Sequence, residues 1–417
     1  MIIATAIMAG FEHEITSKIY NFWGQIHINH YNSLSLFESE PIDVNKSYIQ
    51  QLKNIPNIKT INTYTTLGGI IKTKDELHGI VLKGIDKTYN WETFQPYIKQ
   101  GDKIAFSDSS ASNDIIISEK TAKLLRLKLK DNILIYFTPK HKSSSSPSIR
   151  KFTIKAIYST GIDEFDKIYA LVDIRKTQQL LMWQPQQVAG LEIHLHNISF
   201  LEKIDVYKNY FKENESFNKI ENPFEKALSF LNILMQKNSE QITIEHYSNS
   251  IFYQYTNSEH YCRSIVEIFP SIFDWIQVNN INKWVVLVLM ILVSIINMIT
   301  AILVLIIERT PMIGLLKTFG SNDKEIQKIF LYKAAYIIIW GLFWGNIIGI
   351  GLCFIQQYFG LIQLDEENYY VSKVPILLSF SSIILINMGS IFIILCTLIL
   401  PTKIVSKITP IKALRFQ

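Results

Sequence analysis

The sequence predicts an α+β domain outside the membrane, followed by membrane-spanning helices. The chain of 417 residues is 48% hydrophobic and 18% charged, which is too apolar for an ordinary soluble enzyme and too charged for a protein wholly buried in lipid. Residues 11–280 are polar with mixed charges, whereas apolar runs dominate from Trp284 onward. Within the polar part, short strand-like runs are interspersed with helical patterns.

Three segments are long and apolar enough to cross about 30 Å of hydrocarbon. They are residues 284–307, 331–355 and 376–400. The only charge inside them is Lys333, which stands near one end of the second segment and can reach the interface there. We therefore predict three membrane spans in the last third of the chain.

The basic residues predict the direction of these spans. The loop 308–330 and the C-terminal tail 401–417 each carry four Lys or Arg residues, whereas the loop 356–374 carries Asp365, Glu366 and Glu367 against one lysine. Because short basic loops stay in the cytoplasm, the first loop and the tail are predicted to be cytoplasmic. The polar region before the spans then lies outside, which predicts a multi-pass inner-membrane protein with a large extracytoplasmic domain.

The first ten residues are apolar but too short to span a bilayer, and they lack the charged start of a signal peptide. We interpret them as the outer end of a first transmembrane helix whose beginning is missing from this sequence. The predicted organisation is thus a helix remnant at 1–11, an extracytoplasmic α+β domain at 12–280 and a membrane domain at 281–417.

The outer region shows many short elements between turn signals. Helical patterns occur at 44–52, 119–127, 174–181 and 201–211, and strands are predicted at 25–29, 79–83, 114–117, 133–137, 152–157, 169–172 and 191–195. This mixture without regular βαβ alternation predicts an α+β domain. Residues 139–147, PKHKSSSSP, read as an exposed loop, and residues 213–264 as irregular structure or peripheral helix.

No catalytic or metal site is predicted. A P-loop, a GxSxG elbow and a CxxC pair are absent from the sequence, and the three cysteines give no framework. Glu192, His194 and His196 share one strand face, which could hold a metal but fits a solvated face better. The net charge of +5 shows no basic stripe with aromatics, so nucleic acid is not an expected partner.

The cytoplasmic loop is the most informative stretch. Pro311 suits the first turn of a helix, which we expect over residues 312–319 and which Gly320 would end. Asn322 and Glu325 then predict a capping box for the helix that enters the second span. A short helix with one apolar side at this place is a docking element or, alternatively, a helix resting on lipid.

Small and polar residues mark faces of the spans. Gly341, Gly345 and Gly349 recur every four residues on one helix face, which suits close packing within the chain or an interface between subunits. Asn297, Asn346 and Asn387 give each span one amide, for which hydrogen bonds between helices are expected. The absence of ionisable residues in mid-span disfavours a transporter coupled to protons or ions.

These motifs resemble the FtsX/MacB-type permeases of ABC exporters, and among them the LolC/LolE-type subunits of lipoprotein-releasing systems. The resemblance rests on ERTPMIGLLKTFGSND at 308–323 and IFLYKAAYIIIWGLFWGNIIGIGL at 329–352. It continues in NYYVSKVPI at 368–376 and ITPIKALRF at 408–416, and in the outer region through residues 115–172 and FDWI at 273–276.

The resemblance implies four spans with a MacB-like periplasmic domain inserted between the first and second. It implies a dimer with a second copy or a paralogue, and a cytoplasmic ABC ATPase that binds ATP and Mg, while this non-catalytic chain binds no cofactor. The short cytoplasmic helix would be the coupling helix seated in that ATPase, with the residues Met312, Ile313, Gly314, Leu315, Leu316, Lys317 and Gly320. ATP-driven closure would move the spans and the periplasmic domain with them.

The implied function is release of lipoproteins from the inner membrane. In such systems a hook-like loop captures a periplasmic lipoprotein carrier, and the matching place in this sequence holds Pro139, Lys140, His141, Lys142 and Pro147. This loop is more basic and serine-rich than the apolar hook that the resemblance implies. Two alternatives remain at this stage: a MacB-like efflux permease driven by mechanotransmission, and an FtsX-like regulator of cell-wall hydrolases that transports nothing.

Overall fold

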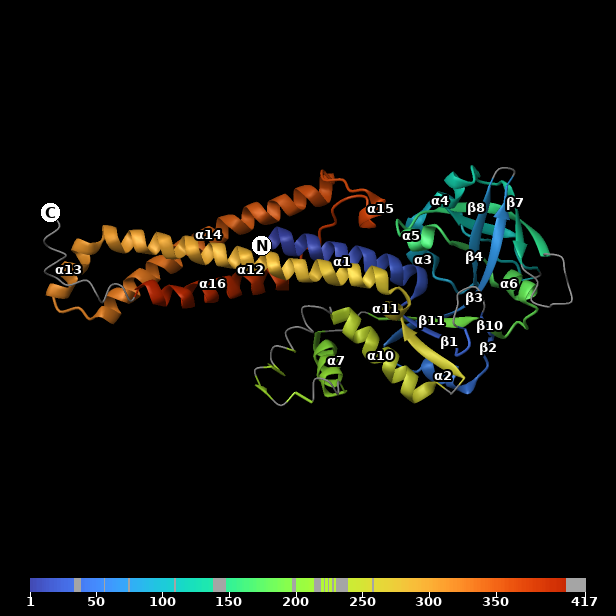
Figure 1. Cartoon of the computed structure of the whole chain (residues 1–417), viewed down its shortest axis with the longest axis horizontal. Helices are drawn as coiled ribbons and strands as arrows, with labels where there is room; N and C mark the ends of the chain where they lie inside the picture. Colours follow the sequence, from blue (N-terminus) through green and yellow to red (C-terminus); the bar gives the residue numbers. More distant parts are fainter. Residues whose placement is uncertain are drawn as a thin grey trace. The chain divides into compact units, whose positions relative to one another are not determined.

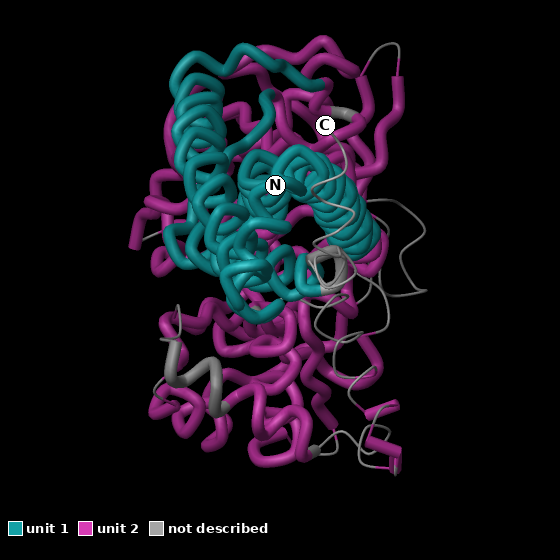
Figure 2. The backbone as a smooth tube through the Cα atoms, turned by 90° about the vertical axis from the view of Figure 1, so that its left-hand side faces the viewer, with its two compact units in different colours: residues 1–14, 276–364, 373–417 teal, residues 15–275, 365–372 magenta. Residues whose placement is uncertain are grey.

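The computed structural model (Figure 1) describes residues 1–33, 39–55, 57–73, 76–108, 110–137, 148–196, 200–213, 239–256 and 259–402, together with scattered positions between 219 and 229. The chain forms two compact units, coloured separately in Figure 2. Unit 1 comprises Met1–Glu14, Ile276–Leu364 and Lys373–Gln417. Unit 2 comprises Ile15–Trp275 and Asp365–Ser372.

Unit 1 is built from long helices. Its members are α12 (Pro270–Glu308), α13 (Thr310–Thr318), α14 (Asp323–Phe359) and α16 (Phe380–Thr402), with the first part of α1 (Ile2–Trp23). Within the described residues, three helices are long and apolar enough to cross a membrane: Pro270–Glu308, Asp323–Phe359 and Phe380–Ile399. The first two contain the predicted spans 284–307 and 331–355, and the third covers most of the predicted span 376–400 but begins at Phe380.

The core of unit 1 lies where three helices and α13 meet. Ile302 and Ile306 of α12 pack with Phe330 of α14 and Leu398 of α16, and Ile313 of α13 closes the cluster. Isoleucine is the commonest buried residue of this cluster, and its members hold the helices together by van der Waals packing. The apolar residues on the other faces point outward.

The N-terminal residues are helical rather than extended. Within unit 1, the N–H of Leu377 donates to the carbonyl oxygen of Ala6 at 3.0 Å. Gly10 permits this approach, since a Cβ there would lie 2.3 Å from the carbonyl oxygen of Pro375. The expected helix remnant therefore packs with the chain around the third span, while the count of four spans remains a prediction.

Unit 2 contains a ten-stranded mixed sheet in the order β12-β1-β11-β3-β4-β9-β6-β8-β5, with β7 pairing β3 and β8. A second sheet pairs β10 (Gln187–Val188) with β2 (Ile42–Asp43). The strands of the large sheet are β1 (Ile26–His30), β3 (Ile58–Lys72), β4 (Leu77–Ile85), β5 (Ile98–Gly101), β6 (Asp114–Ser118), β7 (Asn132–Phe137), β8 (Ser148–Tyr158), β9 (Tyr169–Asp173), β11 (Gly190–Leu195) and β12 (His260–Ser264).

Short helices accompany this sheet. They are α2 (Ser47–Leu52), α3 (Trp91–Phe94), η1 (Gln95–Tyr97), α4 (Glu119–Leu124), α5 (Asp163–Asp166), α6 (Ile174–Leu181), α7 (Phe200–Glu213), α10 (Ser239–Tyr255), α11 (Ile265–Ile268) and α15 (Glu366–Tyr369). Helix α4 begins where predicted, because the Ser118 hydroxyl accepts the N–H of Thr121 at 3.0 Å. Strands and helices are mixed without a βαβ rhythm, so the α+β class is confirmed.

Two of the apolar clusters in the described part of unit 2 lie on the large sheet. One surrounds Ile117, Phe152 and Val172 on the central strands, and the other surrounds Ile28, Ile193 and Ile244, where α10 packs on the sheet edge. The second core corrects the expectation for residues 213–264. Part of this region is α10 and part is β12, which forms the edge strand, so it belongs to the fold rather than lying beside it.

The longest strand, β3, is absent from the predicted elements. Its sequence IKTINTYTTLGGIIK contains two consecutive glycines, which weaken a strand pattern. The structure gives the reason for Gly69: a Cβ there would lie 2.8 Å from Ile135 and 2.9 Å from Phe137 of β7. Gly69 therefore permits β7 to pack closely against β3. The same glycine weakens the strand pattern in the sequence, which is why β3 was not predicted.

Candidate functional site

The predicted coupling helix is present as α13 and begins at Thr310, two residues before the expected start. Its residues divide into two sets. Ile313 and Gly314 are buried, and Ile313 belongs to the core of unit 1. Met312, Leu315 and Phe319 are 38%, 50% and 79% exposed. The helix is thus anchored by one side and presents an apolar surface on the other.

A rigid turn follows α13. Gly320 has φ +88. Its N–H donates to the carbonyl oxygen of Lys317 at 3.1 Å, and the N–H of Ser321 donates to the carbonyl oxygen of Leu316 at 3.1 Å. These two bonds form a Schellman motif, which needs the left-handed glycine that the sequence supplies. The predicted end of the helix at Gly320 is therefore confirmed.

The start of α14 is fixed as predicted. Asn322 and Glu325 form a capping box, in which the Glu325 carboxylate accepts the N–H of Asn322 at 3.1 Å. The Lys317 ammonium lies 2.8 Å from the Asp323 carboxylate and joins α13 to the first turn of α14. Lys317 is therefore engaged in the turn rather than presented with the exposed apolar residues.

The three glycines of α14 have different surroundings. No described atom lies within 4 Å of a Cβ built at Gly341 or Gly345, whereas a Cβ at Gly349 would lie 3.8 Å from Ile2. Gly349 thus faces α1, whereas Gly341 and Gly345 face no described residue of this chain. Of the two readings of this face, packing within the chain fits Gly349 alone.

The three asparagines of the spans also differ in their hydrogen bonds. Asn346 and Asn387 exchange side-chain hydrogen bonds at 3.3 and 3.2 Å, which links α14 to α16 as expected. Asn297 is exposed on α12, and no described residue hydrogen-bonds its side chain. The predicted interhelical bond therefore exists for two of the three spans.

The predicted hook residues Pro139, Lys140, His141, Lys142 and Pro147 lie outside the described residues. The strands on either side, β7 and β8, pair antiparallel, with Phe137 opposite Ser148. The segment 138–147 therefore connects the two strands of a hairpin.

The position of Glu192 on β11 corrects the prediction that this strand presents a solvated face. Glu192 was expected on a solvated face, but its side chain is 2% exposed and its carboxylate lies 2.6 Å from the ammonium of Lys83, which is 0% exposed. Burial raises the pKa of Glu192 to about 7 and lowers that of Lys83, and the opposite charge of each partner counteracts the shift. Of Glu192, His194 and His196, only Glu192 joins this pair, and the described residues hold no group of side chains fit for a metal.

Lys83 also holds the end of the first helix. Its ammonium donates to the carbonyl oxygen of Phe22 and lies 3.9 Å from the ring centroid of Trp23. Phe22 and Trp23 form the last turn of α1, where unpaired carbonyls favour a cation. Lys83 of β4 and Glu192 of β11 therefore fasten α1 to the sheet within unit 2, a site that the sequence pattern did not reveal.

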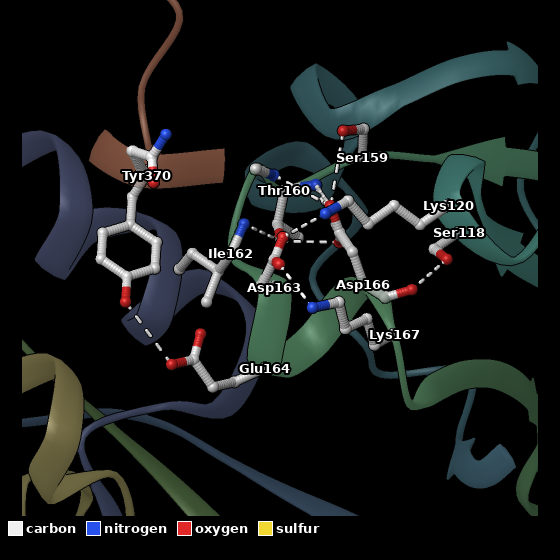
Figure 3. A network of polar contacts seen from close by, with 12 residues as sticks. Ser118, Lys120, Ser159, Thr160, Ile162, Asp163, Glu164, Asp166, Lys167 and Tyr370 are labelled. Carbon is white, nitrogen blue, oxygen red and sulfur yellow. Dashed lines mark hydrogen bonds and ion pairs between the residues drawn. The ribbon is translucent and has the colours of Figure 1, made fainter. Parts of the chain in front are cut away.

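A second polar cluster surrounds α5 (Figure 3). The buried Asp166 carboxylate accepts the N–H groups of Thr160 and Gly161 at 3.1 and 3.0 Å and the Thr160 hydroxyl at 2.8 Å. Burial raises the pKa of Asp166, and these hydrogen bonds act against that rise. Beside it, Asp163 lies 2.6 Å from Lys120 and 2.8 Å from Lys167.

The segment between the second and third spans returns to this cluster. Residues 365–372 belong to unit 2, and Tyr370 adopts φ 61. Its carbonyl oxygen accepts the ammonium of Lys18 at 2.8 Å, and its ring packs edge-on against Trp275 at 5.6 Å. In Figure 3 the Tyr370 hydroxyl points to Glu164 on α5, 3.5 Å away.

Tyr370 therefore contacts the last part of α1, the first part of α12 and α5. All three contacts lie within unit 2. Sequence reasoning missed this role, although the stretch 368–376 was one of the segments that carried the family resemblance.

Comparison with known proteins agrees with this organisation. Residues 284–410 match the FtsX family, described as FtsX-like permease C-terminal. The chain is 18% identical to the lipoprotein-releasing system transmembrane protein LolC of Neisseria meningitidis serogroup B, over 100% of this chain and 91% of that protein. It is also 18% identical to the LolE protein of Haemophilus influenzae, over 99% of this chain and 90% of that protein.

Among solved structures, the periplasmic region of MacB from Actinobacillus actinomycetemcomitans matches 60% of this chain and 92% of its own length, with 12% identity and a TM-score of 0.32. The chain therefore carries an FtsX-like permease C-terminal region and is similar over its whole length to LolC and LolE, which confirms its resemblance to this family of ABC exporter permeases.

Proposed function

We propose that this chain is the transmembrane subunit of an ABC transporter complex that releases lipoproteins from the bacterial inner membrane. In this proposal a separate cytoplasmic ATPase hydrolyses ATP, and the spans transmit its motion to a periplasmic domain. The full-length similarity to LolC and LolE supports the substrate class. The exposed apolar side of α13, held by a capped and ion-paired turn, supports the coupling role.

The exposed side of α13 is the observation that carries the proposal. A docking helix must present apolar residues to its partner while its own backbone stays fixed. Leu315 and Phe319 meet the first requirement because they are exposed, and the Schellman motif with the Lys317–Asp323 ion pair meets the second. Gly314 is buried, so a charge there would disturb the core of unit 1 as well as any partner.

Leu315→Asp tests the coupling role without this ambiguity. The variant is expected to fold normally and to lose the ATPase from the purified complex, or to lose stimulation of its ATP hydrolysis by at least tenfold. Ser321→Asp is the matched control, since it adds the same charge just beyond the helix end. Normal binding and stimulation with Leu315→Asp would show that α13 does not dock the ATPase.

Native mass spectrometry of the purified complex tests the substrate class. A bound diacylated lipopeptide is the expected result. Co-purification with an outer-membrane channel instead of a lipopeptide would favour a MacB-like efflux permease, and hydrolase binding by the periplasmic domain would favour an FtsX-like regulator.

Two further partners belong to the proposal. A second copy or a paralogue would pack against the open glycine face at Gly341 and Gly345. A periplasmic lipoprotein carrier would bind the hairpin loop between β7 and β8. Deleting residues 140–146 should abolish cross-linking to the carrier, and unchanged cross-linking would exclude the loop as the hook.

A further inference from the structure

A pocket of about 370 Å³ lies in unit 1 at the end of α12, the start of α13 and the first turns of α14. Its lining includes two cations, Arg309 and Lys333, and two tyrosines, Tyr332 and Tyr336. Leu305 and Phe330 contribute apolar walls. This volume is at the lower end of the range typical of small-molecule sites.

The two cations of this pocket have no acidic partner among the residues that the structure describes. The Lys333 ammonium lies 5.5 Å from the ring centroid of Tyr336, and no carboxylate lines the pocket. Elsewhere in the same region, Lys317 is paired with Asp323. Arg309 and Lys333 are therefore available to an anion from outside the chain.

The surroundings show what kind of anion fits. Lys333 stands about 15 Å along α14 from its first residue, where the apolar run of the span has already begun. Tyr332 is 75% exposed and Tyr336 is 57% exposed, and exposed tyrosines at the end of a span favour the headgroup region of a bilayer. The ligand must therefore carry its negative charge at the boundary of an apolar medium.

We propose that this pocket binds the headgroup of an anionic phospholipid. The phosphate would lie between Arg309 and Lys333, and the glycerol and acyl chains would follow the apolar wall along α12 and α14. Basic pockets between transmembrane helices are suited to such headgroups because charge and apolar contact act together. A free phosphate compound would satisfy the cations but leave the apolar wall unused, and the observations therefore favour the lipid.

Lipid retention measured on the purified full-length chain tests this site. Nanodiscs or micelles supplemented with phosphatidylglycerol or phosphatidylcholine provide the probes, and native mass spectrometry counts the lipids that remain. The wild type should retain phosphatidylglycerol in preference to phosphatidylcholine. Arg309→Gln and Lys333→Gln should each weaken phosphatidylglycerol binding about fivefold, and the double variant about 25-fold.

Matched controls separate the pocket from general surface charge. Lys324→Gln and Lys328→Gln remove exposed cations of α14 outside the pocket and should leave retention unchanged. Arg309→Lys and Lys333→Arg keep the charges and should retain the lipid. Equal thermal unfolding of all variants in lipid-free detergent checks that the fold survives.

Four results would overturn the proposal. Equal retention of the two lipids by the wild type, or equal loss in the Lys324 and Lys328 controls, would show that no specific site exists. Displacement by soluble glycerol phosphate at the same concentration would identify a site for free phosphate compounds. Unchanged phosphatidylglycerol retention in the double variant would show that Arg309 and Lys333 do not hold the lipid.

Discussion

The two units differ in where their described charged residues lie. In the apolar windows of the three long helices of unit 1, only 17%, 17% and 11% of residues are buried, so most apolar side chains face outward. Among the described residues, the side chains of Asn346 on α14 and Asn387 on α16 form a hydrogen-bonded pair. Unit 2 instead buries Lys83, Glu192 and Asp166 beneath its surface.

This contrast shows that the surrounding medium decides how well the type of a residue predicts its place in the fold. In an apolar medium, hydropathy along the sequence shows the helices directly, whichever way they face. In water, a charged residue is expected outside, and a buried pair such as Lys83 and Glu192 breaks that rule. The helices of unit 1 can therefore be predicted from the hydropathy of the sequence, whereas the buried pair of Lys83 and Glu192 in unit 2 cannot.

The buried pair gives the largest expected effect. Lys83→Met leaves the Glu192 carboxylate without its cation and should lower the free energy of unfolding by about 3–5 kcal/mol. Chemical unfolding of the full chain in detergent, followed by the fluorescence of tryptophans such as Trp23, measures this. The double variant Lys83→Met/Glu192→Met removes both charges and should recover most of the loss. A fully stable single variant would mean that the pair does not fasten α1.

A smaller effect is expected from pH. Burial lowers the pKa of His27 to about 3, with Lys83 adding to the shift. The unfolded chain binds a proton near pH 6.5 and the folded chain does not, so stability is full above pH 6.5 and falls as the pH drops toward 3. At pH 4.5 the loss due to His27 is about 2–3 kcal/mol.

His27→Gln should flatten this acid limb of the stability curve in the same unfolding assay, since glutamine is neutral throughout. His196→Gln, at an exposed position, serves as the control and should leave the curve unchanged. An acid limb that is identical in His27→Gln and the wild type would contradict the assignment to His27.

The asparagine pair of unit 1 should contribute less than either effect in unit 2. Asn346→Leu and Asn387→Leu should each cost about 1 kcal/mol, and the double-mutant cycle should give a coupling of about 0.6 kcal/mol. The cycle is measured by unfolding in detergent. A coupling near zero would show that the hydrogen bonds at 3.3 and 3.2 Å do not stabilise the pair.

The smallest effect on the chain itself is expected at the open glycine face. Gly345→Leu meets no described atom and should change the stability of the isolated chain by less than about 0.5 kcal/mol. If a second subunit packs there, the same variant should abolish the dimer in cross-linking or mass photometry. Gly351→Leu is the control, because Gly351 is equally open but lies on another side of α14. Dimers that persist in both variants would place the interface elsewhere.

The sequence was sufficient for the spans, the turn after α13 and most strands, because each depends on a local pattern. Gly320 and the Asn322–Glu325 pair act within a few residues of their own position. The contact of Lys83 with Glu192 joins residues 109 positions apart, and that of Lys18 with Tyr370 joins residues 352 positions apart. Such pairs are set by the fold, and no periodicity in one sequence reports them.

The same limit applies to β3. Its two glycines weaken the local pattern, and only the close approach of β7 explains Gly69. The exposure of Glu192 was misjudged for a related reason: alternation along β11 gives the faces of a strand but does not say which face another layer covers.

The chain crosses between the two units four times, at 14/15, 275/276, 364/365 and 372/373. Within unit 2, the carbonyl oxygen of Tyr370 accepts the Lys18 ammonium, its ring packs against Trp275 and its hydroxyl donates to Glu164. Lys18, Trp275 and Tyr370 itself stand near three of these crossings, at 14/15, 275/276 and 372/373. Tyr370 therefore links segments of unit 2 that lie far apart in the sequence, and a change at this one position acts on all of them.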